Sequence, residues 1–382
     1  MTGHQPEDAA KVAGIFGYLA DRDFRGYSPL YEYLSRHISG DTLIPALITR
    51  ANHRSHAPIL FFACVHDLVL REPEGDLARA YQAVAEGVEP SRAEVWPRLQ
   101  ALVTERRDEL DHMLRTRQVQ TNEIGRSSAL IPALTAVGDR FGRPLALIEV
   151  GCSAGLNLLA DHYRVTYAAG DGRVQVGPER SPVQLSCEVH GTRRPPLPDR
   201  TDELAPPAVV IGSRLGLDRN PVDVTDPDAV RWLRACVWPG PGERRRRLDA
   251  AVALAAADPP TLRAGDALDL IDEAVNGVEP GLVPCVVSTW VLAYLTADQR
   301  HDLRRHLDAL GHRGPLAWIT AEYEANVPWL DPPGRRPALD LGQLPTRLGL
   351  ELWDQGEPRG TSLAWMHAHG LWLEWLEDPA PA

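Results

Sequence analysis

Apolar positions in the first third of the chain recur with a helical period. One stripe follows the i, i+3, i+4, i+7 spacing of an amphipathic helix: Val12, Ile15, Phe16 and Leu19. Ser28 followed by Pro29 is typical of a helix start. Residues 59–70 are apolar on nearly every side, which predicts a buried helix. Four leucines between Leu99 and Leu114 indicate one further long helix. We therefore expect a helical domain over residues 1–126.

The pattern changes near residue 125. Residues 145–150 form a short apolar run typical of a strand, and a turn with glycines at both ends follows at 151–155. After the turn, Leu156, Leu159 and Tyr163 fall on one helical face. A strand, a tight turn and a helix make the first half of a βαβ unit, which predicts a parallel sheet.

Residues 164–208 interrupt this pattern with many glycines, prolines and turn signals. We interpret them as an insertion, and we expect a hairpin formed by residues 174–176 and 183–187. After the insertion, strands and helices alternate. The expected strands are 209–218, 284–288 and 316–319, and the expected helices begin at Asp226, near Arg244 and at the capping box Thr296-Ala-Asp-Gln299, with Gly311 as the C-cap of the last helix. A terminal hairpin is expected from residues 350–354 and 361–369.

These elements predict an α/β fold with a Rossmann-like, mostly parallel sheet, a C-terminal antiparallel hairpin and a helical N-terminal domain. The sheet domain is expected to span residues 127–382, with the insertion at about 164–208.

The charge composition of the chain limits the classes of partner that it can bind. The chain has 40 basic and 52 acidic residues in 382, a net charge of −12. An acidic chain is repelled by the negative charges of phosphate backbones and anionic membranes. We therefore expect neither nucleic acid nor a membrane as partner, and we favour a small-molecule substrate. The sequence does not determine the oligomeric state.

Compartment signals point to the cytoplasm. The five cysteines are dispersed and form no CxxC pair, which predicts free thiols and no zinc ribbon. The first twenty residues carry Glu7 and Asp8 and lack a signal-peptide pattern. The longest apolar run, residues 283–295, is shorter than the roughly 20 residues that span a bilayer.

The turn after the first strand, Glu149-Val-Gly-Cys-Ser-Ala-Gly155, is the sharpest candidate for chemistry. A dinucleotide fingerprint needs glycine at the first, third and sixth places and finds it only at Gly151. A G-x-S-x-G nucleophile elbow fits literally, with Ser153 as nucleophile and His367 or His369 as the downstream base, although no HGGG-type oxyanion segment precedes it. The third interpretation is a turn that binds S-adenosylmethionine, in which an acid stands two residues before the first glycine, as Glu149 does.

Residues 147–157 resemble motif I of class I S-adenosylmethionine-dependent methyltransferases, with Ser153 in place of the usual middle glycine. The segments 216–221, 264–267, 286–295 and 314–318 resemble the second to fifth strands of that family, in the same order. The resemblance implies a methyltransferase with S-adenosylmethionine as cofactor. The implied cofactor contacts are Glu149, Gly151, Ser153, Gly155, Asn157, Asp218 at the ribose, Asp266 at the adenine, Ala267 and Ser288.

Nearly the whole chain also resembles a bacterial family recorded as domain of unknown function 2332, which implies fold relatives but no substrate. The stretches that carry this resemblance are 27–31, 120–126, 149–158, 226–239 and 367–370.

Polar residues outside the turn offer further candidates. Dense polarity at 120–126 suggests either a lid over the cofactor or a polar linker. Glu123 and His369 are candidate general bases, needed only for a poorly acidic acceptor such as a hydroxyl. We interpret His367 and His369 as a packed pair, with no metal expected. Tyr294 and Glu322 lie just past expected strand ends, where α/β sheets place sites.

Two alternatives stay open: a scaffold of the same fold that binds cofactor without chemistry, and a serine hydrolase using Ser153.

Overall fold

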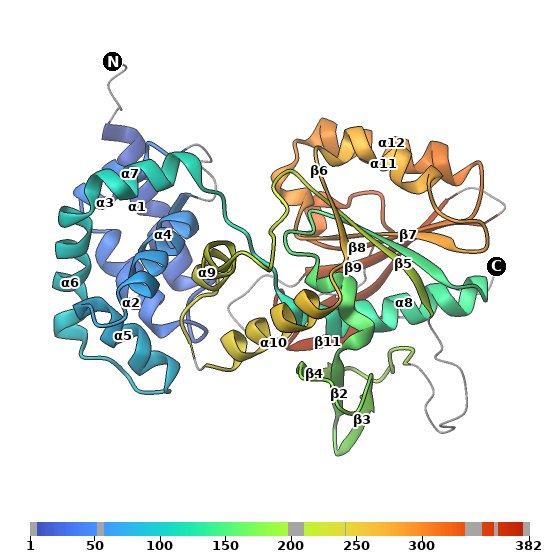
Figure 1. The fold of residues 1–382 in the computed structure, drawn as a ribbon, viewed down its shortest axis with the longest axis horizontal. Coiled ribbons are helices and arrows are strands. Elements are labelled where there is room, and N and C mark those ends of the chain that lie inside the picture. Colours follow the sequence, from blue (N-terminus) through green and yellow to red (C-terminus); the bar gives the residue numbers. More distant parts are fainter. Residues whose placement is uncertain are drawn as a thin grey trace. The chain divides into compact units, whose positions relative to one another are not determined.

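The computed structural model describes residues 6–51, 57–197, 210–240, 242–332, 346–354 and 358–376, which fold into two compact units (Figure 1). One unit holds the described residues up to 121 together with those from 225 to 249. The other holds described residues from 122 to 224 and from 250 onward. Within the described residues, no helix has the length and apolar character to cross a membrane. All five cysteines are free, as predicted, and the structure places all of them in buried positions.

The first unit is built of helices. They are α1 (Pro6–Asp21), α2 (Pro29–Ile38), α3 (Leu43–Ile48), α4 (Ala57–Arg71), α5 (Asp76–Ala85), α6 (Arg92–Glu105), α7 (Arg107–Thr116) and, from later in the chain, α9 (Pro227–Ala235). The predicted start at Pro29 and the buried helix α4 are confirmed. The single long helix expected between Leu99 and Leu114 is wrong, because the backbone leaves helical geometry at Arg106 and two helices result.

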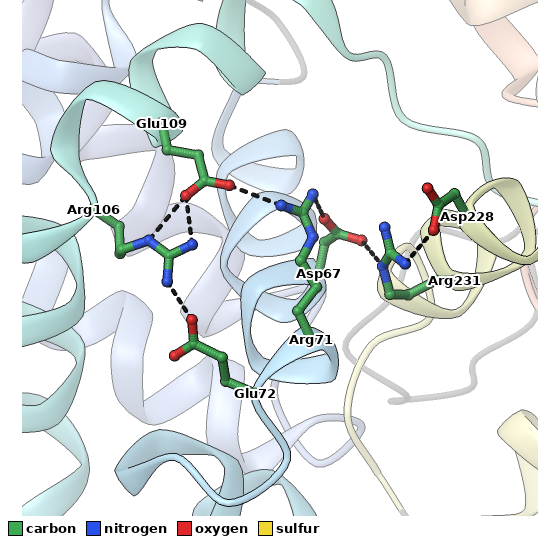
Figure 2. Close-up of polar contacts among 7 residues, drawn as sticks. All are labelled: Asp67, Arg71, Glu72, Arg106, Glu109, Asp228 and Arg231. Carbon is green, nitrogen blue, oxygen red and sulfur yellow. Dashed lines mark hydrogen bonds and ion pairs between the residues drawn. The ribbon is translucent and has the colours of Figure 1, made fainter.

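A chain of alternating charges holds α9 against α4 within this unit (Figure 2). Asp67 of α4 is buried and accepts hydrogen bonds from Arg71 and, at 3.0 Å, from Nε of Arg231 on α9. Arg71 and Arg231 in turn pair with Glu109 at 2.7 Å and Asp228 at 2.5 Å. The buried Asp67 carboxylate therefore accepts hydrogen bonds from two arginines, which offset the cost of removing its charge from water.

The second unit is organised around one eleven-stranded sheet in the order β3-β2-β4-β11-β10-β9-β8-β7-β1-β5-β6. The strands are β1 (Leu145–Val150), β2 (Arg164–Ala169), β3 (Gly172–Val176), β4 (Gln184–His190), β5 (Ile211–Asp218), β6 (Thr261–Ala264), β7 (Val283–Thr289), β8 (Leu316–Glu322), β9 (Thr346–Trp353), β10 (Arg359–Met366) and β11 (Trp372–Trp375). The block β6-β5-β1-β7-β8 is parallel throughout, and β9 and β10 follow as an antiparallel meander. The prediction of an α/β fold with a mostly parallel mixed sheet is confirmed.

The described α-helices of this unit are α8 (Ser127–Phe141), α11 (Ala267–Asn276) and α12 (Ala297–Gly311), and the division between the two units falls within α10 (Glu243–Ala257). The capping box at Thr296 and Gln299 is confirmed. Leu303, Leu307 and Leu310 are buried with Trp318 of β8 in one core cluster. Gly311 is the last residue of α12 and His312 is its C-cap. A Cβ at Gly311 would overlap the Trp353 indole, so packing requires the glycine there.

Several local expectations in this unit are wrong. The helix after the glycine turn is a short 3-10 segment, Leu156–His162, with a kink at Leu159. The insertion forms its hairpin from β2 and β3, whereas β4 pairs in parallel with β2 and β11. Strand β10 ends at Met366, so His367 and His369 lie in the following turn. These features depend on pairing between distant segments, which local periodicity does not encode. Residues 198–208 of the predicted insertion lie outside the described residues.

Candidate functional site

The candidate site lies at one edge of the sheet. Strands β1, β5, β6, β7 and β8 are parallel, so their carboxyl ends meet at this edge. Strand β10 runs in the same direction as β8, because two antiparallel pairings separate them. We call this the carboxyl edge. The chain continues from β1 to β5 on one side and later returns to β7 on the other, so β1 and β7 flank a topological switch point, where open α/β sheets bind ligands.

The turn after β1 is tightly held. Gly151, Ser153 and Gly155 all have positive φ, at 71°, 53° and 69°. The amide of Ser153 donates to Oδ2 of Asp218 at 2.8 Å, and that of Gly151 donates to the Leu217 carbonyl at 2.8 Å. The amides of residues 152, 155 and 156 also donate within the chain. These amides are already used, so they offer no nest for a phosphate, in line with the incomplete dinucleotide fingerprint.

Glu149 lies in β1 directly before the turn. Its side chain is buried, and the residue is 1% exposed. Oε1 accepts a hydrogen bond from Nδ2 of Asn157 at 3.0 Å, and Oδ1 of Asn157 accepts one from Ser127 at 3.3 Å. Oε2 has no hydrogen-bond partner among the described residues. Burial raises the pKa of Glu149 to about 8, against the lowering effects of Asn157 and Arg126.

Residues 122–126 connect the turn to the ends of other strands. Nδ2 of Asn122 donates to the Cys152 carbonyl at 2.9 Å, and its Oδ1 accepts from the Leu156 amide at 3.2 Å. Arg126 is buried and donates from Nε to the Ala368 carbonyl at 3.0 Å and from Nη1 to the Thr289 carbonyl at 3.2 Å. The segment therefore joins the glycine turn to the carboxyl ends of β7 and β10.

Glu123 and His369, the two candidate bases, contact each other. Nδ1 of His369 lies 2.8 Å from Oε2 of Glu123, and both residues are buried. Oε1 of Glu123 accepts from the Gly125 amide at 3.2 Å, which fixes the carboxylate. His367 accepts the His369 amide at Nδ1, 3.0 Å away. Within the described ranges, no group of three or more His, Cys, Asp or Glu residues could hold a metal ion.

The 122–126 segment and the turn after β10 pack backbone against backbone. Gly370 has φ of 71°, and a Cβ there would overlap the Gly125 carbonyl. We expect Gly370→Ala to lower the free energy of unfolding by about 1–3 kcal/mol more than Gly170→Ala, because both glycines have positive φ but Gly170 has open space around it. Urea unfolding of the two variants measures this difference. Equal losses would show that the contact has no role in stability.

A second buried carboxylate belongs to Glu322, the last residue of β8. Glu322 is fully buried, and its Oε1 accepts from the amides of Val291 and Leu292 at 2.8 and 2.9 Å. Its Oε2 has no hydrogen-bond partner among described residues, and burial raises the pKa of Glu322 to about 7.

Trp290, which follows β7, has φ of 57° and donates from Nε1 to Oγ1 of Thr346 at 3.0 Å. A bulky residue in this conformation is strained, a feature that concentrates at functional sites.

The structure brings together most of the predicted site residues. Asp218 contacts the turn although some sixty residues separate them in sequence, because β5 pairs with β1. Ser288 accepts a hydrogen bond from the Trp318 indole at 2.7 Å inside the sheet. Asp266 caps α11 ahead of Ala267 and pairs with Arg219 at 2.5 Å.

Three further residues lie at the carboxyl edge of the sheet. Tyr294 is 51% exposed in a 3-10 turn after β7. Trp290 and Thr320 were not predicted as site residues. No sequence signal marks a tryptophan that adopts positive φ, or a strand threonine whose hydroxyl has no hydrogen-bond partner among the residues described.

Comparison with known proteins identifies the family only. A family model described as "Uncharacterized protein conserved in bacteria (DUF2332)" matches residues 14–375, and the chain belongs to this family. No match was found among curated proteins or among solved structures.

Proposed function

We propose that this member of an uncharacterised bacterial family is an S-adenosylmethionine-dependent methyltransferase that binds its cofactor at the carboxyl ends of β1, β5 and β6. The observation that carries the proposal is the side chain of Glu149. It is buried beside a turn of strained backbone, and one of its oxygens has no hydrogen-bond partner in the part of the chain that the structure describes. Leaving such an oxygen unsatisfied is costly. The ammonium group of S-adenosylmethionine can donate to this oxygen, and its positive charge favours the ionised form of Glu149.

The sheet supports this proposal. The order β6-β5-β1-β7-β8 is third, second, first, fourth and fifth strand of a Rossmann-type sheet, counted without the insertion and the antiparallel strands. Glu149 lies near the carboxyl end of β1, Asp218 at that of β5 and Asp266 just after β6. The three acids therefore follow one another along the chain in the order that the motifs imply.

The residues fit the cofactor as follows. Oδ2 and Oδ1 of Asp218 each accept one backbone amide, from Ser153 and Asn220 at 2.8 Å. A carboxylate has about four lone-pair sites, so Asp218 retains capacity for ribose hydroxyls. Asp266 holds Arg219 and the start of α11 at the proposed adenine end.

In the proposed reaction, the bound cofactor supplies a methyl group on a positively charged sulfur that leaves as a thioether. The chain positions the reactants and excludes water. Glu149 would bind the ammonium group of the cofactor, and Asp218 would orient its ribose. The Glu123–His369 pair would take the proton of a hydroxyl acceptor, since the Glu123 carboxylate stabilises the imidazolium that forms.

Isothermal calorimetry with S-adenosylmethionine and S-adenosylhomocysteine tests the proposal. We expect both to bind the wild type, and Asp218→Asn to weaken binding about tenfold or more, because one acceptor of the ribose hydroxyls becomes a donor. The exposed Asp171, which lies nearer to the motif in sequence, provides the control Asp171→Asn with unchanged affinity. Unchanged affinity in Asp218→Asn, with the melting temperature retained, would exclude the ribose role.

A second candidate is the serine hydrolase, favoured by the positive φ of Ser153, since a nucleophile elbow is a strained turn. Its Oγ is buried and has no hydrogen-bond partner among the described residues, so no histidine of the described ranges is in place to activate it. We expect a fluorophosphonate probe to leave Ser153 unlabelled. Labelling that is lost in Ser153→Ala would support the hydrolase instead.

The scaffold alternative predicts binding without transfer. Native mass spectrometry of freshly purified protein would detect cofactor carried through purification. A screen of metabolite extracts with methyl-labelled S-adenosylmethionine then separates a methyltransferase, which transfers label, from a scaffold that only binds.

A further inference from the structure

Two polar atoms of β8 lack partners at the carboxyl edge. Oε2 of Glu322 and Oγ1 of Thr320 are both buried without a hydrogen-bond partner among the described residues. Residues two apart in a strand face the same side of the sheet, so the two side chains stand on one face. Neither atom contributes to the proposed cofactor contacts, which lie on β1, β5 and β6.

The Glu322 carboxylate is held in one orientation. Oε1 accepts two backbone amides, from Val291 and Leu292, which fixes the plane of the carboxylate and leaves Oε2 for another donor. The strained Trp290 precedes these amides, and its ring lies edge-on to Tyr323 with centroids 4.7 Å apart. An oriented acceptor beside strained backbone matches a preorganised binding group better than a filler of the core.

The donor that suits this pair is an amine. A hydroxyl has a single donor hydrogen, whereas a protonated primary amine has three and so can donate to more than one acceptor. Hydrogen bonds from an ammonium to a carboxylate are charge-assisted and stronger than those from a neutral hydroxyl. Arg126 and Arg300 act on Glu322 electrostatically, but neither donates a hydrogen bond to it.

We infer that Glu322 and Thr320 form the acceptor subsite of this protein and that they bind a primary amine of the methyl acceptor. This assignment rests on the proposed methyltransferase function, because it places the acceptor across β7 from the glycine turn. The class of acceptor is then an amine-bearing small molecule, with Glu322 as a binding residue that selects it by charge.

Ligand-observed NMR tests the subsite with small probes, in the presence of S-adenosylhomocysteine. The probes are methylamine, ethanolamine and benzylamine, each beside the alcohol of the same skeleton: methanol, ethylene glycol and benzyl alcohol. We expect at least one amine to bind the wild type at least tenfold more tightly than its alcohol. Glu322→Gln should weaken that amine at least tenfold, and Thr320→Val should weaken it less. The exposed Glu279 gives the control Glu279→Gln, which changes the net charge equally and should leave amine binding unchanged.

Three results would overturn the subsite: no amine binds the wild type, the alcohols bind as tightly as the amines, or Glu322→Gln keeps the amine affinity with its fold intact. Glutamine retains an acceptor for the two amides, so we expect the variant to fold. Calorimetry with S-adenosylmethionine on the same proteins separates this inference from the proposed function. Cofactor binding without amine binding rejects the subsite alone, whereas a wild type that binds no cofactor rejects the methyltransferase.

Discussion

Replacing Glu149 by glutamine is expected to stabilise the fold at alkaline pH and to abolish S-adenosylmethionine binding. Burial raises the pKa of this carboxyl from its ordinary value of 4.5 to about 8. The stability that a neutral Glu149 supports is fully present below pH 4.5 and is lost as the pH rises through about 8. Glutamine does not titrate and can still accept the Asn157 hydrogen bond. Since one pKa unit corresponds to about 1.4 kcal/mol, the variant should gain up to about 5 kcal/mol over the wild type by pH 9.

Urea unfolding between pH 4 and pH 9 measures this gain, with Glu279→Gln at the surface as control. Calorimetry at pH 8 measures the loss of cofactor binding, expected because an amide cannot neutralise the ammonium group. A stability difference that does not change with pH would contradict the buried, protonated Glu149. A glutamine variant that binds S-adenosylmethionine as tightly as the wild type would remove its role in the proposed site.

Asp67→Asn is expected to destabilise the helical unit by about 3–5 kcal/mol, the cost of removing one partner from a buried ion pair. The Asp67 side chain is 1% exposed, and it accepts from both Arg71 and Arg231. The loss leaves these two guanidinium groups without their shared anion. Because Arg231 lies on α9, we expect hydrogen exchange of the α9 amides to accelerate most (Figure 2).

Glu72 provides the matched control for this prediction. It ends the same chain of charges through Arg106, but its side chain is 58% exposed. Glu72→Gln should therefore change stability by less than about 1 kcal/mol, as exposed ion pairs do. Equal effects of the two variants in thermal unfolding would mean that burial of Asp67 contributes nothing.

The sequence by itself determined the elements whose signals are local. Pro29 begins a helix because its fixed φ suits the first helical position, and Thr296 and Gln299 cap α12 because their side chains reach backbone amides within one turn. Strand β1 and the glycine turn after it also follow from local periodicity and from motifs in sequence.

The tertiary structure alone decided the contacts between distant segments. The Glu123–His369 contact joins residues 246 positions apart, and the pairing of β5 with β1 brings Asp218 to the turn. The break at Arg106, the β2–β3 hairpin and the positive φ of Trp290 carry no local signature. The same holds for the oxygens of Glu149 and Glu322 that lack a hydrogen-bond partner within the described segments. The physical reason is that burial and hydrogen-bond satisfaction depend on what surrounds an atom in space, and that environment exists only after the chain has folded.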